Sequence, residues 1–133
     1  MTTQTDILTT HGVSVPPHLA VADVPIARGV PARQGDVLAL PVRPGLVADT
    51  TPIPAEGIQV VAGEAERNTH LLVGDGTFHA LDGPQDLGTL TVPDGGSAFL
   101  LHTGEHGAIQ LAPGQWTIRR QRQQADEIEL VRD

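Results

Sequence analysis

Glycine and proline recur at intervals of about ten residues along most of this chain, and this spacing limits what the chain can fold into. The sequence has 15 Gly and 11 Pro among 133 residues, and both residue types interrupt helices and favour tight turns. No ten-residue segment has helical periodicity without a Gly or Pro. Turn signals at this spacing are typical of all-β sandwiches and barrels. The sequence therefore predicts an all-β fold: a small sandwich or barrel of about seven to nine short antiparallel strands, with an extended N-terminal arm.

The segments between these turns have the length and composition of β-strands. In one of them, Leu90 and Val92 alternate with threonines and so share one face. Trp116 and Ile118 alternate in the same way after a Pro-Gly turn, and we expect both to face the core. The predicted strands are 36–42, 58–62, 69–73, 77–81, 89–92, 97–102, 108–111 and 115–121.

Two glycine-containing turns predict how some of these strands connect. Gly74-Asp75-Gly76 has the chemistry of a three-residue hairpin loop. We therefore expect 69–73 and 77–81 to form a β-hairpin. Pro93-Asp-Gly-Gly96 predicts a second tight turn.

Residues 1–32 differ from the rest because four prolines, at 16, 17, 25 and 31, interrupt any regular period. This composition predicts an extended arm with polyproline II character. The seven large apolar residues between positions 13 and 30 make it too apolar for a solvated linker, so we expect it to dock on its own domain or on a neighbouring subunit. A β domain at 33–124 and a tail at 125–133 follow. The expected interface residues are Val13, Val15, Leu19, Val21, Val24 and, as the alternative to a core position, Trp116.

The charge balance argues against several classes of partner. The chain has 16 acidic and 8 basic residues, a formal net charge of −8, which repels a nucleic-acid backbone. We expect the basic cluster at Arg119, Arg120 and Arg122 to pair with acidic groups of the protein or of a neighbouring subunit. A small nucleic-acid-binding barrel is the disfavoured alternative. No apolar run could span a membrane and no secretory signal is recognisable, which favours the cytoplasm of the producing cell, or incorporation in a particle.

Few residues offer catalytic chemistry. The chain has no cysteine, which excludes disulfides, thiolate catalysis and cysteine-ligated zinc. Ser14 and Ser97 do not lie in a nucleophile elbow, and no phosphate-binding glycine loop is present. The sequence therefore predicts no catalytic residue.

The histidines are the candidate metal ligands. His102 and His106 lie close together on either side of Glu105, and His70 belongs to another predicted strand. Imidazole and carboxylate together suit zinc, iron, manganese, nickel or copper. No short motif fixes a ligand set here, so half-buried histidines without a metal are the simpler interpretation.

Four blocks of sequence resemble a small, uncharacterised family of bacterial and phage β-domains. They are 34–42, 63–70, 103–109 and 111–124, which are similar to the family patterns QGDVLLIPV, GHxH, HxxH and GxYxVxRQREY. The resemblance spans residues 33–124 and leaves the arm outside it.

The resemblance implies a metal site built from the two histidine pairs. Asn68 and Thr103 stand where the first histidine of each pair would be, so that His70 and His106 remain. Two imidazoles are too few for a closed site, and His102 or Glu105 would have to substitute. We therefore expect the site to be lost and no cofactor to be bound, with a divalent metal as the alternative.

These observations favour a non-catalytic structural protein that assembles through its arm with itself or with a larger assembly protein. The family's occurrence suggests a phage or phage-derived particle. The alternative is a cupin-like metal-binding module or metalloenzyme that uses His70, His102 and His106.

Overall fold

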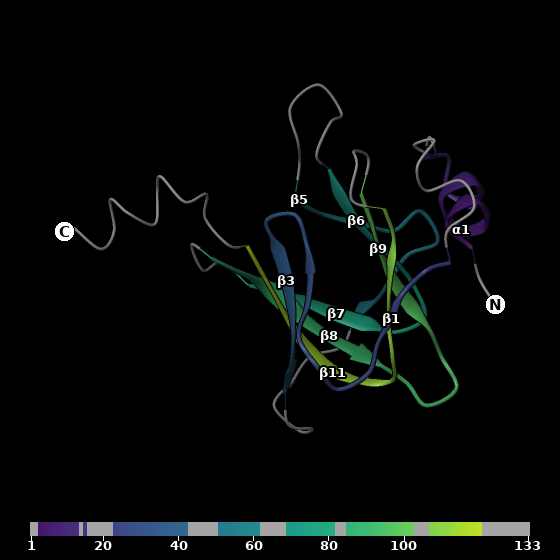
Figure 1. Ribbon diagram of the computed structural model, residues 1–133. Helices are drawn as coiled ribbons and strands as arrows, with labels where there is room; N and C mark the ends of the chain where they lie inside the picture. The colour runs from purple at the N-terminus through teal and green to yellow at the C-terminus, as the bar shows by residue number, and fades with distance from the viewer. Residues whose placement is uncertain are drawn as a thin grey trace.

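The described residues of the computed structural model form two β-sheets that pack face to face, with one short helix on the outside (Figure 1). The structure describes residues 3–13, 15, 23–42, 51–61, 69–81, 85–102 and 107–120. The predicted all-β class is confirmed, and the arrangement is a sandwich, since the two sheets do not close into a barrel. The described residues form eleven strands, more than the seven to nine expected, because several edge strands are only two or three residues long.

The five-stranded sheet has the order β1-β10-β9-β6-β5, and the six-stranded sheet has the order β2-β3-β11-β8-β7-β4. All neighbouring strands are antiparallel except β1 and β10. The first sheet contains β1 (Ile26–Ala27), β10 (Ile109–Leu111), β9 (Ala98–His102), β6 (His70–Gly74) and β5 (Ile58–Val61). The second contains β2 (Ala32–Gln34), β3 (Val37–Val42), β11 (Gly114–Arg120), β8 (Asp86–Val92), β7 (Thr77–Ala80) and β4 (Thr51–Pro52).

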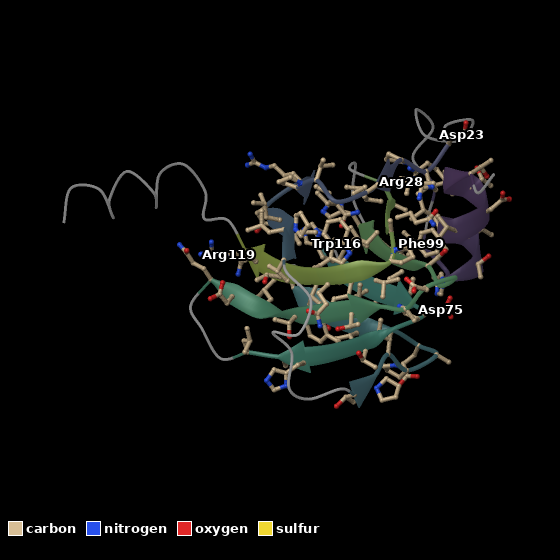
Figure 2. All side chains as sticks on the ribbon, turned by 90° about the horizontal axis from the view of Figure 1, so that it is seen from below. Asp23, Arg28, Asp75, Phe99, Trp116 and Arg119 are labelled. Carbon is tan, nitrogen blue, oxygen red and sulfur yellow. The ribbon has the colours of Figure 1, made fainter. Side chains whose placement is uncertain are left out.

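The core lies between the two sheets and follows the predicted alternation. Leu90, Val92 and Ile118 are all buried in it. Trp116 is 1 % exposed, and its indole Nε1 donates to the carbonyl oxygen of Ala112 over 3.0 Å (Figure 2). The prediction that Trp116 and Ile118 face the core is confirmed. A ring buried this deeply in its own chain offers no surface to a partner, which goes against the interface alternative for Trp116.

The expected hairpin at Gly74-Asp75-Gly76 is wrong. β6 belongs to the five-stranded sheet and β7 to the six-stranded sheet, so this turn carries the chain across the sandwich. Both glycines have positive φ, +109° and +135°, and a Cβ on either would overlap a backbone carbonyl oxygen, that of Ser97 or of Thr91. A second connection between the two sheets lies beside this one: the predicted turn at 93–96, which joins β8 to β9. Glycine is required at 74 and 76 because the two connections pack closely against each other.

The prediction that the whole N-terminal arm is extended is wrong. It contains the helix α1 (Gln4–Thr10), which ends before the first proline of the chain. A capping box starts the helix: the Thr3 hydroxyl accepts from the backbone N–H of Asp6, and the Asp6 carboxylate accepts from the backbone N–H of Thr3. This motif satisfies otherwise free N–H groups at the first turn. Thr3 and Asp6 have the spacing of a capping box, which indicates a helix start, but the prediction for the arm rested on its prolines instead.

The limits expected for the arm, the β domain and the tail fall partly outside the described residues. The arm residues Leu19 and Val21 and the tail 125–133 belong to the part that is not described. Within the described residues, no helix is long and apolar enough to cross a membrane.

Candidate functional site

Two of the three candidate metal ligands, His70 and His102, meet inside the sandwich. They are paired across β6 and β9, with ring centroids 4.5 Å apart. Strand alternation places both on the inward side of the sheet, together with Leu72 and Leu100. His70 is 1 % exposed and His102 is 2 % exposed. The third candidate, His106, lies outside the described residues, as does Glu105.

Gln34 and Asp36 contact the two ring nitrogens of His70. The Nδ1 atom lies 2.9 Å from Oε1 of Gln34, and the Nε2 atom lies 3.1 Å from Oδ1 of Asp36. Gln34 ends β2 and Asp36 follows in the turn to β3, so both side chains reach His70 from the other sheet.

The direction of these hydrogen bonds fixes the protonation of His70. The Nε2 atom of Gln34 donates to the carbonyl oxygen of Leu100 over 2.8 Å and also to the carbonyl oxygen of Gly107. Carbonyl oxygens only accept, so this amide must present its own oxygen to Nδ1 of His70. A carboxylate also only accepts, so Nε2 of His70 must donate to Asp36. Both ring nitrogens are therefore donors, and His70 is a buried imidazolium.

Asp36 supplies the negative charge that balances this imidazolium. Burial alone would raise the pKa of Asp36. A hydrogen bond from Arg120 and the charge of His70 outweigh burial and lower the pKa below its ordinary value. The Nε atom of Arg120 lies 3.1 Å from Oδ2 of Asp36. Asp36 is thus ionised at neutral pH and accepts on both oxygens.

The resulting cluster of Gln34, Asp36, His70 and Arg120 is a brace between the two sheets. Both N–H groups of the His70 ring donate hydrogen bonds. A metal could therefore bind His70 only after one of these hydrogen bonds had broken and a proton had left. Among the described residues, no group of three or more His, Asp or Glu side chains could hold a metal ion. The described part of the cluster does not fit a metal site in this arrangement.

A second candidate site lies on the outer face of the five-stranded sheet, where α1 packs (Figure 1). Ile7 and Leu8 of the helix bury their side chains against Val73, Leu101 and Ala108 of the sheet. Phe99, beside the helix in Figure 2, belongs to the same cluster. The predicted interface residues Val13, Val15 and Val24 also pack there. The arm therefore docks on its own domain, which was one of the two expected arrangements.

The arm also occupies the free edge of β10. The side-chain amide of Gln4 donates to the carbonyl oxygen of Ala108 over 3.0 Å and accepts from its N–H over 2.7 Å. Further along, the N–H of Gln110 donates to the oxygen of Pro25, and the N–H of Ala112 donates to that of Ala27. Ala108, Gln110 and Ala112, which alternate along β10 and its two flanking residues, are thus hydrogen-bonded to the arm. The Gln4 side chain pairs with the first of them, and the backbone of 25–27 pairs with the other two.

One peptide group connects the brace with the arm. The carbonyl of Gly107 accepts from Gln34, and the N–H of Ala108, on the same peptide plane, donates to Gln4. A glutamine from the interior and a glutamine from the arm therefore hold this peptide from its two ends. Sequence reasoning missed both glutamines, because a lone glutamine at the end of a strand or in a first helical turn carries no distinctive pattern.

Two members of the predicted arginine cluster, Arg119 and Arg120, pair with acidic side chains of the same chain. The Nε atom of Arg119 lies 2.8 Å from Oδ1 of Asp86, and the Nε atom of Arg120 lies 3.1 Å from Oδ2 of Asp36. Figure 2 places Arg119 at the end of the molecule away from α1. Arg122 lies outside the described residues.

Residues 33–121 match the model of a family described as a domain of unknown function, DUF8820. No curated protein and no solved structure matches the chain.

Proposed function

Because the chain belongs to the DUF8820 family of domains of unknown function, we propose its role from its geometry: it is a non-catalytic structural protein that assembles through its N-terminal segment, residues 3–27. The observation that carries this proposal is the position of that segment. It precedes residue 33, where the family match begins, yet it covers an apolar face and pairs a strand edge of the family domain.

The N-terminal segment docks on two kinds of surface, an apolar face and a strand edge. An apolar face and an unpaired strand edge are both surfaces that proteins cover, since each favours association when exposed. A helix in a groove and a strand added to an edge are two recurrent modes of recognition. The N-terminal segment combines them.

The buried cluster supports a structural role in place of a catalytic one. The described hydrogen-bonding groups of Asp36 and His70 are directed at each other and at Gln34 and Arg120. General acid–base catalysis needs a proton donor or acceptor within reach of a substrate, and His70 is 1 % exposed. The brace stabilises the sandwich that presents the docking surface.

The partner we propose is the protein itself, within a larger assembly in the cytoplasm of the producing cell. A phage or phage-derived particle suits a protein used in many copies, and the sequence blocks resemble proteins of that setting. The net charge of −8 and the pairing of Arg119 and Arg120 with acidic side chains make nucleic acid the disfavoured partner.

Substitution of Leu8 tests the proposal. Leu8→Asp places a carboxylate in a position that is fully buried, and so should expel α1 from the sheet. We expect light scattering to show loss of the native assembly or precipitation through the uncovered face. Thr9→Asp adds the same charge at an exposed position of the same helix and should leave the mass unchanged. Unchanged mass and solubility in Leu8→Asp would sink the assembly role.

Metal analysis tests the non-catalytic part. We propose that no metal is bound at stoichiometric occupancy, because both nitrogens of His70 act as donors. About one equivalent of zinc, iron or nickel in purified protein would overturn this and favour the metalloenzyme alternative.

A further inference from the structure

We infer that the β10 edge and the adjoining outer face form an acceptor site for the N-terminal segment of a second copy of this chain, so that copies exchange their segments. This inference rests on the proposed assembly role and names its partner and its contacts. We call the β10 edge with Val73, Leu101 and Ala108 the acceptor site, and residues 3–27 the donor segment.

The acceptor site needs an occupant. Without the donor segment, the N–H and carbonyl of Ala108 and the N–H groups of Gln110 and Ala112 would lose the partners they have now. The apolar side chains under Ile7 and Leu8 would also be exposed. Unpaired backbone groups beside an apolar face favour association with another chain. The site can therefore bind any segment that offers a side-chain amide, backbone carbonyl oxygens and apolar side chains in the same order.

The described parts of the donor segment, at its start and at its end, contact each other. Thr3 and Asp23 form an isolated antiparallel bridge, which ties the start of the segment to the stretch that leads into β1. Val24 packs in one cluster with Ile7 and Leu8. The helix and β1 can therefore move together from one acceptor site to another.

The link between the donor segment and its own domain is a suitable hinge. Residues 28–31 are all exposed. Gly29 has φ +63° with open space where a Cβ would stand, and Pro31 follows two residues later. Short hinge loops of this kind permit exchange of an element between identical chains, which is a low-cost route to dimers. The contacts of α1, Gln4 and β1 with the acceptor site would be the same whether that site belonged to the same chain or to another copy.

The apolar residues near the hinge favour a second copy over an unrelated partner. Ile26 is 41 % exposed and Val30 is 55 % exposed, and they are two of the three exposed large hydrophobic residues among those described. A reciprocal exchange in which the two hinges ran side by side would bury these side chains against their counterparts. An unrelated partner would have to supply a helix with a glutamine in its first turn and a parallel strand, whereas each copy already carries both.

Cysteine cross-linking between two variants tests the exchange. Ile26 and Gln110 are neighbours in the β1–β10 register, and adjacent strands lie within the range a disulfide can span. The chain has no native cysteine, so each introduced thiol is unique. An affinity-tagged Ile26→Cys chain and an untagged Gln110→Cys chain are refolded together and then oxidised. A disulfide between them can form efficiently only if the donor segment of one chain occupies the acceptor site of the other.

We expect roughly a hundredfold more of the mixed cross-link than in a mixture of Ile26→Cys with Glu56→Cys, because docked thiols meet at a local concentration near mM. Glu56 is exposed just before β5, at the opposite edge of the sheet. The double variant Ile26→Cys/Gln110→Cys shows that the pair can form a disulfide at all, within one chain or between two. If that variant forms only the link within one chain, and the mixture gives no more than the Glu56 control, exchange is refuted. In that case, if Leu8→Asp still disrupts a native assembly, only the exchange of segments is refuted and the assembly role stands. If Leu8→Asp has no effect on the native mass, the assembly role is refuted as well.

Discussion

A buried imidazolium is costly unless both of its N–H groups and its charge are matched, and His70 meets this condition through two residues that are close together in sequence. Gln34 accepts from one ring nitrogen and Asp36 from the other. His70 itself is held on β6, in the opposite sheet. The brace therefore depends on a correct pairing of the two sheets, and it should contribute more to the uniqueness of the fold than an apolar contact of similar size.

Gln34→Leu tests the brace. The substitution removes a hydrogen-bond partner from Nδ1 of His70 and from the carbonyl oxygens of Leu100 and Gly107. We expect the free energy of unfolding, measured in urea, to fall by roughly 2–4 kcal/mol, since a buried group left unpaired costs about 1–3 kcal/mol. Gln59→Leu, on the exposed side of β5, should change it by less than about 0.5 kcal/mol. Equal effects at the two positions would contradict the brace.

The protonation of Asp36 predicts an acid dependence. Folding lowers the pKa of Asp36, so the ionised carboxylate stabilises the fold above its unfolded pKa of about 3.9. That contribution is lost as the pH falls through the lower pKa of the folded state. The difference in unfolding free energy between the wild type and Asp36→Asn should therefore be full near pH 6 and shrink below about pH 4. A difference that stays constant from neutral to acid pH would show that the charge of Asp36 does not act in this way.

The residues of the brace were only half predictable. His70 and His102 are candidates from their residue type alone, because imidazole is a common metal ligand. Their pairing across β6 and β9 was not predicted. Asp36 and Gln34 lie within the Gln34-Gly-Asp-Val turn, where the turn itself accounts for their presence. Their contact with His70 is between residues far apart in sequence and needs the pairing of the two sheets, which no local pattern specifies.

At the scale of elements, strands were more predictable than their partners. Short apolar runs between turns gave most strands within a residue or two, because alternation and turn chemistry are local properties. The predicted pairing of β6 with β7 is wrong for a related reason. A glycine-rich turn of three residues fits a hairpin and a crossing between sheets equally well, and only the crowding against Ser97 and Thr91 distinguishes them.

Alanine at Gly74 tests this crossing. A Cβ there would overlap the carbonyl oxygen of Ser97, at a φ of +109°. We expect Gly74→Ala to lower the free energy of unfolding by about 3–5 kcal/mol, as strain and overpacking add. Gly95→Ala is the matched control, since Gly95 also has positive φ, +79°, but open space where the Cβ would stand. It should cost only about 1–2 kcal/mol. Similar costs at both positions would mean that the close approach at Gly74 is not important.

At the scale of the whole molecule, the chain consists of a family domain and a donor segment that covers it. The fold class followed from the spacing of turns, and the docking of the arm followed from its apolar composition. The choice between its own domain and a neighbouring subunit could not follow from sequence. Both choices bury the same side chains, and they differ only in the course of the hinge at residues 28–31.

The native mass of the unmodified chain, measured by sedimentation over a range of concentrations, tests the central claim of assembly most directly. If the N-terminal segment joins copies of this protein, the mass should be that of two or more 133-residue chains. The associated fraction should rise with protein concentration, as mass action requires. A mass of one chain at every concentration, in a soluble and folded sample, would contradict assembly through the donor segment.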